Sequence, residues 1–425
     1  MTNMQLTSFE EMKKNNLDTS NKQTKFNIFE LAYILLFVLA MFSGSTALSG
    51  YVMPMICAIV IILFLTSIIK GFPKNAIKYK GDYLLKSIMA LIVLFLIYQL
   101  SFSYNKSVTA VFVERFFVYS LLFVFVPKMD LTFKVIKVIR WYSFFVAISI
   151  IITTLITGSH SGGLVGNYQF AGMMMSISFG VFLTDYYFEK NNMNLFGLAL
   201  TFIALLTSGK RTFSLLALLA YLLIFLISKN KDKRKKFIYM TGSLIMIVFI
   251  AYFTIPSVRL VAERLIAYSG DTTYNGRSYF WTAAIDIYEE NKAVGIGMGC
   301  FSHYFDAFYH RLGNMEAYDA HNIYIQMLAE LGIVGELLFV SLFTTGLIKT
   351  FLLLKKESIR KNKKCMYILC YSLYIQLWFI IYGFTGNPLY GAGQCFFYIS
   401  AVAMMLSLKN YTRENKDVNN NEIMR

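Results

Sequence analysis

The chain has 425 residues, of which 57% are hydrophobic and 17% aromatic, while only 15% carry a charge. Soluble globular domains are about 45–50% apolar and roughly 25% charged, so this composition excludes an ordinary soluble domain and predicts a polytopic membrane protein. A net charge of +16 would suggest nucleic-acid binding in a soluble protein. In a membrane protein, basic cytoplasmic loops explain it, so no nucleic-acid partner is expected.

Apolar runs long enough to cross a bilayer recur along most of the chain. Residues 1–26 are polar and are expected to form a cytoplasmic tail rather than a cleavable signal peptide. Transmembrane helices are predicted within 27–255 and 331–408, and a second tail at 409–425. The predicted spans are 27–43, 48–69, 83–102, 109–127, 139–157, 168–188, 194–208, 212–228, 237–255, 331–354, 366–385 and 395–408. The expected fold is all-α, with about twelve transmembrane helices.

Loop charge predicts how these helices are oriented. The loops at 70–82, 127–140, 189–194, 229–236 and 355–364 hold about 21 lysines and arginines, against about three in the short loops opposite. The basic loops and both termini are therefore expected in the cytoplasm. The turn 208–212, the loop 386–394 and the long segment 256–330 then lie outside. That long segment, between the ninth and tenth helices, is the expected catalytic loop.

The first candidate functional residue in the external segment 256–330 is Arg277. Residues 277–292 are expected to form a helix that Arg277 opens and that carries Trp281. The run AVGIGMG that follows is interpreted as a flexible connector. It fails the dinucleotide-binding pattern because Cys300 stands where the third glycine is required and no strand precedes it.

His321 heads the next helical pattern. His321 and Asn322 precede a segment whose apolar residues recur every four positions. Gly332 is placed to end that helix, and Gly335 allows close packing of the next one. The positive end of the helix dipole biases the His321 ring toward its neutral form, although Asp319 could counter that or orient the ring. A neutral histidine there suits a general base for a sugar hydroxyl, and a capping or surface histidine is the alternative.

Cationic side chains are scarce on the predicted outer side, which draws attention to Lys210, Arg211 and Arg277. A guanidinium group can bind a diphosphate through paired hydrogen bonds, and headgroup anchoring is the alternative. Glu114 and Arg115 lie inside a predicted span, where a charge is costly and marks a functional candidate. A helix-packing ion pair is the alternative there.

Aromatic residues gather in the external segment, with Tyr274 and Trp281 among them. They could stack on sugar rings or form an interfacial aromatic belt. The histidines have no cysteine or carboxylate at ligand spacing, so no metal site is predicted.

The order His321-Asn322, nine residues, Gly332, two residues, Gly335 resembles the signature of the O-antigen ligase and polymerase family. These are membrane proteins of bacterial surface-polysaccharide assembly, with about a dozen transmembrane helices and a large late external loop. An arginine in an earlier external turn adds to the resemblance, as do an arginine-to-tryptophan segment and a glycine-rich piece. Here these are Arg211, residues 277–281 and residues 295–301.

The resemblance implies metal-independent, inverting glycosyl transfer at the outer face of the bacterial cytoplasmic membrane, with no cofactor. The donor would be an oligosaccharide on undecaprenyl diphosphate. His321 would deprotonate or orient the acceptor hydroxyl, while Arg211 and Arg277 would hold the diphosphate. The expected substrate-binding residues are Lys210, Asn322, Trp281, Tyr274, Glu114 and Arg115. The implied partners are this lipid-linked oligosaccharide, the bilayer, and the flippase and chain-length regulator of the same pathway.

A polymerase joins repeat units, whereas a ligase moves the finished glycan to lipid A core or another acceptor. The Lys/Asn/Ile-rich composition is typical of an AT-rich genome, which is compatible with a capsule or exopolysaccharide producer and favours the polymerase. The ligase stays as the first alternative. A flippase or transporter is the second, although such a protein would call for internal repeats and ionisable residues near the middle of the membrane.

Overall fold

The computed structural model describes residues 28–44, 49–69, 82–128, 132–188, 191–209, 212–218, 277–309 and 319–408, with scattered positions between 239 and 263. Regular structure in these ranges is helical, as predicted. The helices are α2 Ile28–Met41, α3 Ser49–Ile69, α4 Tyr83–Gln99, α5 Lys106–Phe125, α6 Thr132–Thr157, α7 Tyr168–Phe188, α8 Asn192–Thr207, α12 Arg277–Glu290, α13 Phe301–Phe308, α14 Ile323–Leu354, α15 Glu357–Lys361, α16 Lys363–Tyr382 and α17 Ala392–Ser407. Both predicted tails, and parts of the predicted spans 212–228 and 237–255, lie outside the described residues.

Several helices have the length and composition needed to cross a bilayer. Among the described residues these are Gly50–Ile69, Lys106–Phe125, Val138–Thr157, Ile323–Leu354 and Lys363–Tyr382. Their outer surfaces stay apolar, as in α3, where Ile62 is 61% exposed and Ile69 is 79% exposed. An exposed face of this kind is costly in water and suits contact with lipid tails.

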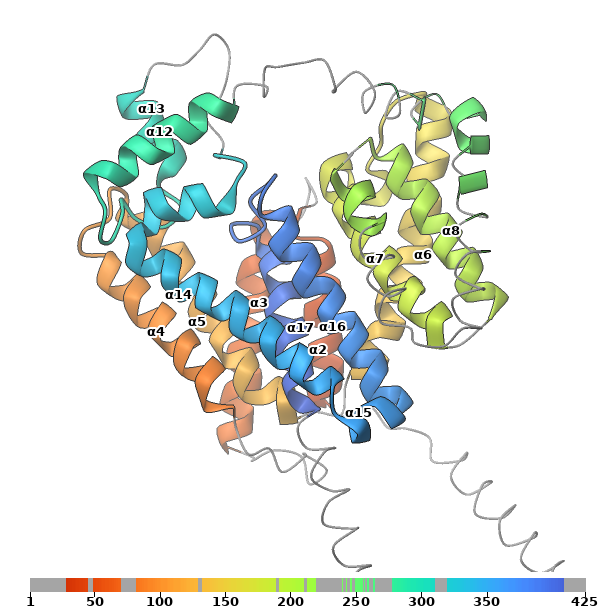
Figure 1. Cartoon of the computed structure of the whole chain (residues 1–425), viewed down its shortest axis with the longest axis horizontal. Helices are drawn as coiled ribbons and strands as arrows, with labels where there is room; N and C mark the ends of the chain where they lie inside the picture. The colour runs from red at the N-terminus through yellow and green to blue at the C-terminus, as the bar shows by residue number, and fades with distance from the viewer. Residues whose placement is uncertain are drawn as a thin grey trace, which may run out of the picture.

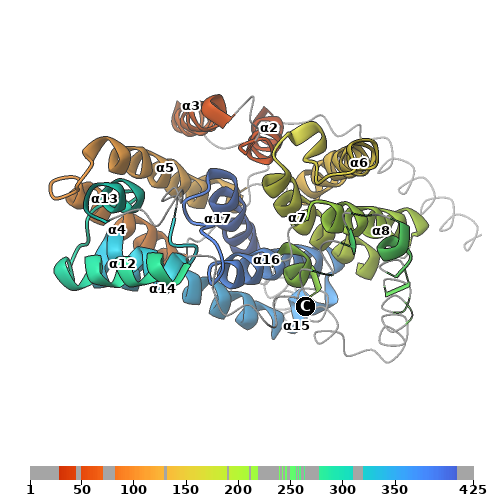
Figure 2. The same cartoon turned by 90° about the horizontal axis from the view of Figure 1, so that it is seen from above.

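The helices form two sides joined by a central pair. In Figure 1, α4, α5 and α14 lie on one side and α6, α7 and α8 on the other, with α16 and α17 between them. Figure 2 shows the same order from above, with α2 and α3 along one edge. Because α16 packs against both α7 and α14, it holds the two sides together. The short helices α12 and α13 lie across one end of α4, α5 and α14 (Figure 1).

The helix α14 is interrupted at Gly332, and backbone hydrogen bonds next to this break join α14 to the segment that carries α12 and α13. Gly332 has φ 61° and ψ −172°, a conformation that is strained for any residue with a side chain. Next to the break, the N–H of Ile333 donates to the carbonyl of Lys292 over 2.9 Å. The N–H of Gly297 likewise donates to the carbonyl of Glu330 over 2.9 Å. The helix that precedes the break therefore begins at Ile323, within the segment predicted to be external.

Residues 293–299 are a packed connector, so their interpretation as a flexible one is wrong. Ile296 is 4% exposed and Met298 is fully buried. The Gln99 side chain on α4 donates to the Val294 carbonyl over 2.6 Å and accepts from the Met298 N–H over 3.2 Å. The glycines are needed for close approach, because a Cβ on Gly295 would lie 2.3 Å from the carbonyl carbon of Glu330.

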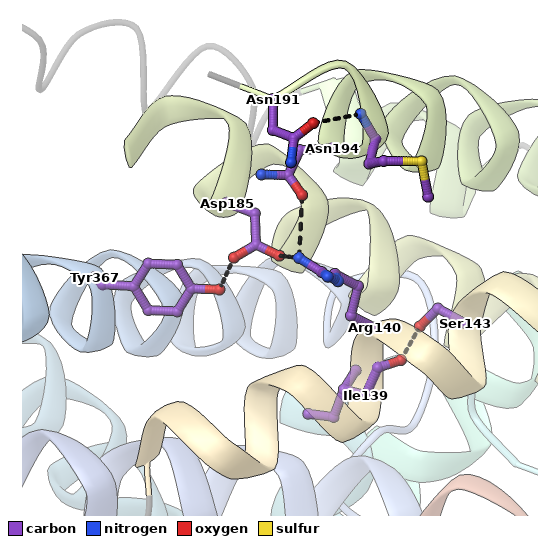
Figure 3. A network of polar contacts seen from close by, with 8 residues as sticks. Ile139, Arg140, Ser143, Asp185, Asn191, Asn194 and Tyr367 are labelled. Carbon is purple, nitrogen blue, oxygen red and sulfur yellow. Dashed lines mark hydrogen bonds and ion pairs between the residues drawn. The ribbon is translucent and has the colours of Figure 1, made fainter. Parts of the chain in front are cut away.

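A polar network fixes one end of α7 and α16 (Figure 3). Arg140 on α6 lies 3.8 Å from the Asp185 carboxylate of α7 and donates to the Asn194 side chain of α8 over 3.2 Å. The Tyr367 hydroxyl of α16 donates to the other carboxylate oxygen of Asp185. Removing one partner would leave a poorly hydrated charge, so the network ties the helices together at this end. The other ends of α7 and α16 surround a cavity.

Candidate functional site

A cavity of about 270 Å³ lies at the N-terminal end of α7 and the C-terminal end of α16. Its walls come from segments far apart in the sequence. They are Gly44, Asn167, Gln169, Phe170, Met173, Thr212, Phe213, Arg277, His321, Tyr382, Thr385 and Gln394. The structure therefore brings Arg277 and His321, two of the three predicted catalytic residues, into one cavity.

Arg277 is placed by the packing of α12. It is the first residue of that helix, which buries Phe280, Ala284 and Ile287 on one face, as a helical repeat requires. The buried face packs against α13, where the Phe280 and Phe305 rings lie 5.1 Å apart. Arg277 itself is half-buried and lines the cavity.

His321 is held in a conformation that few residues other than glycine adopt. Its φ is 54°, and among the described residues it is the only non-glycine with a positive φ. That conformation is maintained from both sides of the residue. The Ala320 carbonyl accepts from the Trp281 indole over 2.7 Å, and the Ala320 N–H donates to Gln326 over 3.0 Å. On the other side, the Ile323 N–H donates to the Gly383 carbonyl over 2.8 Å.

Residues 196–340 match the family model described as O-Antigen ligase. This part of the chain belongs to the O-antigen ligase family. The matched residues include Arg277, His321, Gly332 and Gly335. Together with the long apolar helices, the match identifies a multi-pass membrane protein of a glycan-transfer family. A comparison with curated proteins finds no match.

A buried network around Gln326 supports the His321 loop, and it was not predicted from the sequence. The Gln326 amide donates to the carboxylates of Asp319, over 3.2 Å, and Glu330, over 3.1 Å. Its carbonyl oxygen accepts from Asn387, over 2.6 Å, as well as from Ala320. Gln326 and Glu330 stand four residues apart in an apolar helical pattern, a spacing that could have indicated a shared internal face.

The two carboxylates of this network, Glu330 and Asp319, have different contacts. Glu330 is fully buried and accepts from the backbone N–H groups of Gly299, over 2.6 Å, and Phe301, over 2.8 Å. It therefore fixes the start of α13 against α14. Burial raises the pKa of Asp319, while hydrogen bonds from Gln326 and Asn387 oppose that rise. Asp319 stands two residues from His321 but points into the network through Gln326.

Three further residues predicted for the site or its motif lie outside the cavity lining, namely Asn322, Trp281 and Gly335. Asn322 is the N-cap of α14, where its side chain accepts from the N–H of Tyr324 over 3.0 Å. The Trp281 indole holds the Ala320 carbonyl and is absent from the cavity lining. Gly335 packs against α4, since a Cβ there would lie 2.7 Å from the Phe95 ring.

Glu114 and Arg115 lie on α5, outside the cavity lining. Glu114 is exposed. Arg115 donates to the Tyr390 carbonyl over 2.6 Å and lies 4.6 Å from the centre of the Phe112 ring. The contact with Tyr390 ties α5 to the loop between α16 and α17, whereas Phe112 lies on α5 itself. The acceptor is a backbone carbonyl and not the carboxylate of the ion pair given as the alternative.

Lys210, Arg211 and Tyr274 lie outside the described residues. The residues on either side of the Lys210–Arg211 pair are described. Gly209 packs beneath the His160 ring, and Thr212 lines the cavity.

The polar lining of the cavity can bind an anion next to a base. Arg277 supplies a fixed positive charge with several donors, and His321 supplies an imidazole that can accept or donate a proton. Within the described ranges, no group of three or more histidine, cysteine, aspartate or glutamate side chains could hold a metal ion.

Proposed function

We propose that the chain polymerises undecaprenyl-diphosphate-linked oligosaccharide repeat units by inverting glycosyl transfer. The observation that carries this proposal is the cavity shared by Arg277 and His321, two residues of the segment that matches the O-antigen ligase family. A lipid-linked sugar donor has a diphosphate beside its reacting carbon, so a cation and a base are needed close together.

In the proposed step, His321 accepts the proton of an acceptor hydroxyl as its oxygen attacks the anomeric carbon of the donor sugar. The bond from that carbon to the diphosphate oxygen breaks, and its electron pair leaves with undecaprenyl diphosphate. Arg277 stabilises the charge that develops on the leaving oxygen. Attack from the face opposite the leaving group inverts the anomeric configuration.

We propose Arg211 as the second cation on the diphosphate, with Lys210 beside it. The support is the place of Thr212, the next residue in the chain, in the cavity lining. A second cation is useful because the leaving diphosphate carries more charge than one guanidinium neutralises.

We place the reaction at the outer face of the cytoplasmic membrane. The cavity lining comes from the helix ends and loops that loop charge assigns to the outside, including residues 167–173, 382–385 and 394. The long segment 256–330 then acts outside, and both termini lie in the cytoplasm.

A ligase that transfers the finished glycan to lipid A core or another acceptor is the second candidate, and the description of the matched family favours it. Glycan analysis of a strain that lacks the protein separates the two. Accumulated single repeat units on the lipid carrier support the polymerase, whereas accumulated long lipid-linked chains support the ligase. Repeat units trapped on the cytoplasmic side would point instead to a flippase.

Complementation of that strain tests the site. We expect His321→Ala and Arg277→Ala to lower glycan transfer by about 10²–10⁴-fold, because each removes one interaction with the reacting groups. Matched controls are His303→Ala and Arg259→Ala, since both side chains lie outside the cavity lining and Arg259 is 64% exposed. Normal polymer ladders from both site variants, at wild-type protein levels, would refute the mechanism.

A further inference from the structure

The cavity has a second wall whose chemistry differs from that of Arg277 and His321. The ends of α16 and α17 contribute Tyr382 and Gln394 to it. Within the described lining there is no carboxylate, and the polar groups other than Arg277 and His321 are amides and hydroxyls. A wall of this kind favours a ligand that is uncharged and rich in hydrogen-bonding groups.

The Gln394 side chain packs over Gly391, three residues earlier in the chain. A Cβ on Gly391 would lie 1.9 Å from the Gln394 side-chain oxygen and 2.4 Å from its amide carbon. The amide therefore folds directly over the Gly391 backbone, and only glycine leaves room for it. Gly391 has φ −75° and ψ 121°, which alanine adopts without strain, so the glycine is needed for this space and not for its backbone angles.

Tyr382 is fixed from three directions. Its ring centroid lies 4.9 Å from that of Phe213 and 5.3 Å from that of Trp378. A Cβ on Gly386 would lie 2.4 Å from the Tyr382 ring. In the described part of the chain, neither the Tyr382 hydroxyl nor the Gln394 amide has a hydrogen-bond partner. Two other polar residues of the lining are already engaged. Asn167 accepts from the Gln169 N–H over 2.9 Å, and the Thr385 hydroxyl donates to the Tyr382 carbonyl over 3.4 Å.

We propose that Gln394 and Tyr382 form the subsite for the acceptor sugar, an uncharged ring that presents hydroxyl or acetamido groups. The inference rests on the proposed function. The donor is positioned by its diphosphate on Arg277, so it does not depend on neutral contacts. The acceptor hydroxyl must instead reach His321 on a sugar that brings no charge of its own to the reaction, and hydrogen bonds from neutral side chains can position it. The donor and the acceptor are thereby positioned by different side chains of the same cavity.

The test separates the two substrates. The donor is the lipid-linked repeat unit extracted from the strain that lacks the protein. The acceptor is the same oligosaccharide released from its lipid and diphosphate and labelled at its reducing end. Transfer is measured with the full-length protein in membranes, with one substrate varied at a time.

We expect Gln394→Leu and Tyr382→Phe each to raise the acceptor KM by about twofold to tenfold, the effect of one neutral hydrogen bond, with the donor KM unchanged. Tyr98→Phe is the matched control, because Tyr98 is 54% exposed on α4 and lies outside the cavity lining. Gly391→Ala keeps the amide but displaces it, so it should raise the acceptor KM as Gln394→Leu does. Combining the two substitutions should add nothing further.

The results that would overturn the proposed function and the subsite are different. Wild-type protein that transfers no glycan between two intact lipid-linked repeat units contradicts the proposed function itself, whereas transfer there but none to the released oligosaccharide contradicts the subsite. Wild-type transfer with an unchanged acceptor KM in Gln394→Leu and Gly391→Ala contradicts the subsite alone, and so does an equal rise in the donor KM.

Discussion

Replacing Trp281 by phenylalanine removes one hydrogen bond next to His321 while keeping most of the ring volume. The indole N–H reaches the Ala320 carbonyl over 2.7 Å, and Ala320 is fully buried. Without the donor, the carbonyl stays buried and unsatisfied, which costs about 1–3 kcal/mol. If this cost destabilises only the conformation in which His321 has φ 54°, the fraction of protein molecules able to transfer glycan drops by about 5- to 150-fold.

Initial transfer rates from the lipid-linked repeat unit measure this effect in membranes. We expect kcat to fall by the stated factor with the donor KM unchanged, because Arg277 keeps its place on α12. Trp141→Phe is the matched control, since Trp141 is 56% exposed on α6. The decisive comparison uses His321→Ala, whose residual rate should not change further when Trp281→Phe is added. An equal loss in that background would show that Trp281 acts by another route.

Three further predictions concern the stability of the fold and its orientation in the membrane. Gly332→Ala should lower the thermal unfolding midpoint, because strain at φ 61° costs about 1–3 kcal/mol and the new Cβ would lie 2.4 Å from the backbone of the neighbouring segment. Gly50→Ala, with nothing within 4 Å, should not lower it, and equal midpoints in the two variants would contradict the account of the break. The raised pKa of Asp319 means that the folded state favours the protonated acid, so its contribution to stability is present at low pH and lost as pH rises through the folded pKa. Asp319→Asn should therefore match the wild type in acid and become the more stable protein as pH rises, whereas a stability difference independent of pH would argue against this. A membrane-impermeant thiol reagent should label Ser159→Cys on intact cells but reach Lys361→Cys only after permeabilisation; the native cysteines are buried, and the reverse pattern would overturn the orientation.

Features that depend on residues close in sequence could be predicted well. The helix that begins at Arg277 and the helix after Asn322 lie where the local patterns placed them. Apolar periodicity and an N-cap are local signals, so they need no knowledge of the fold. Gly332 was recognised as a helix end for the same reason, and a second helical segment of α14 follows the break.

Features that depend on distant partners could not be predicted. The connector 293–299 owes its order to Gln99, and nothing in its own glycine-rich sequence indicates that partner. The Asn387 side chain donates a hydrogen bond to Gln326, which is 61 positions away in the sequence. The role of Trp281 is a similar case, because a carbonyl acceptor has no sequence signature and an aromatic residue in an external segment suggests sugar stacking first.

The orientation of the chain and the position of the cavity rest on separate observations. Orientation uses only the lysines and arginines of the loops, whereas the cavity follows from the packing of side chains such as Tyr382 and Phe170. A cavity at the Tyr367 end of α16 would have faced the basic loops, which the positive-inside rule assigns to the cytoplasm. It lies instead at the Tyr382 end, whereas at the Tyr367 end Arg140 and Tyr367 both contact Asp185. With the proposed orientation, Arg277 reaches a lipid carrier in the outer leaflet, and the proposed reaction then requires that the repeat unit be moved across the membrane before it can be joined to another.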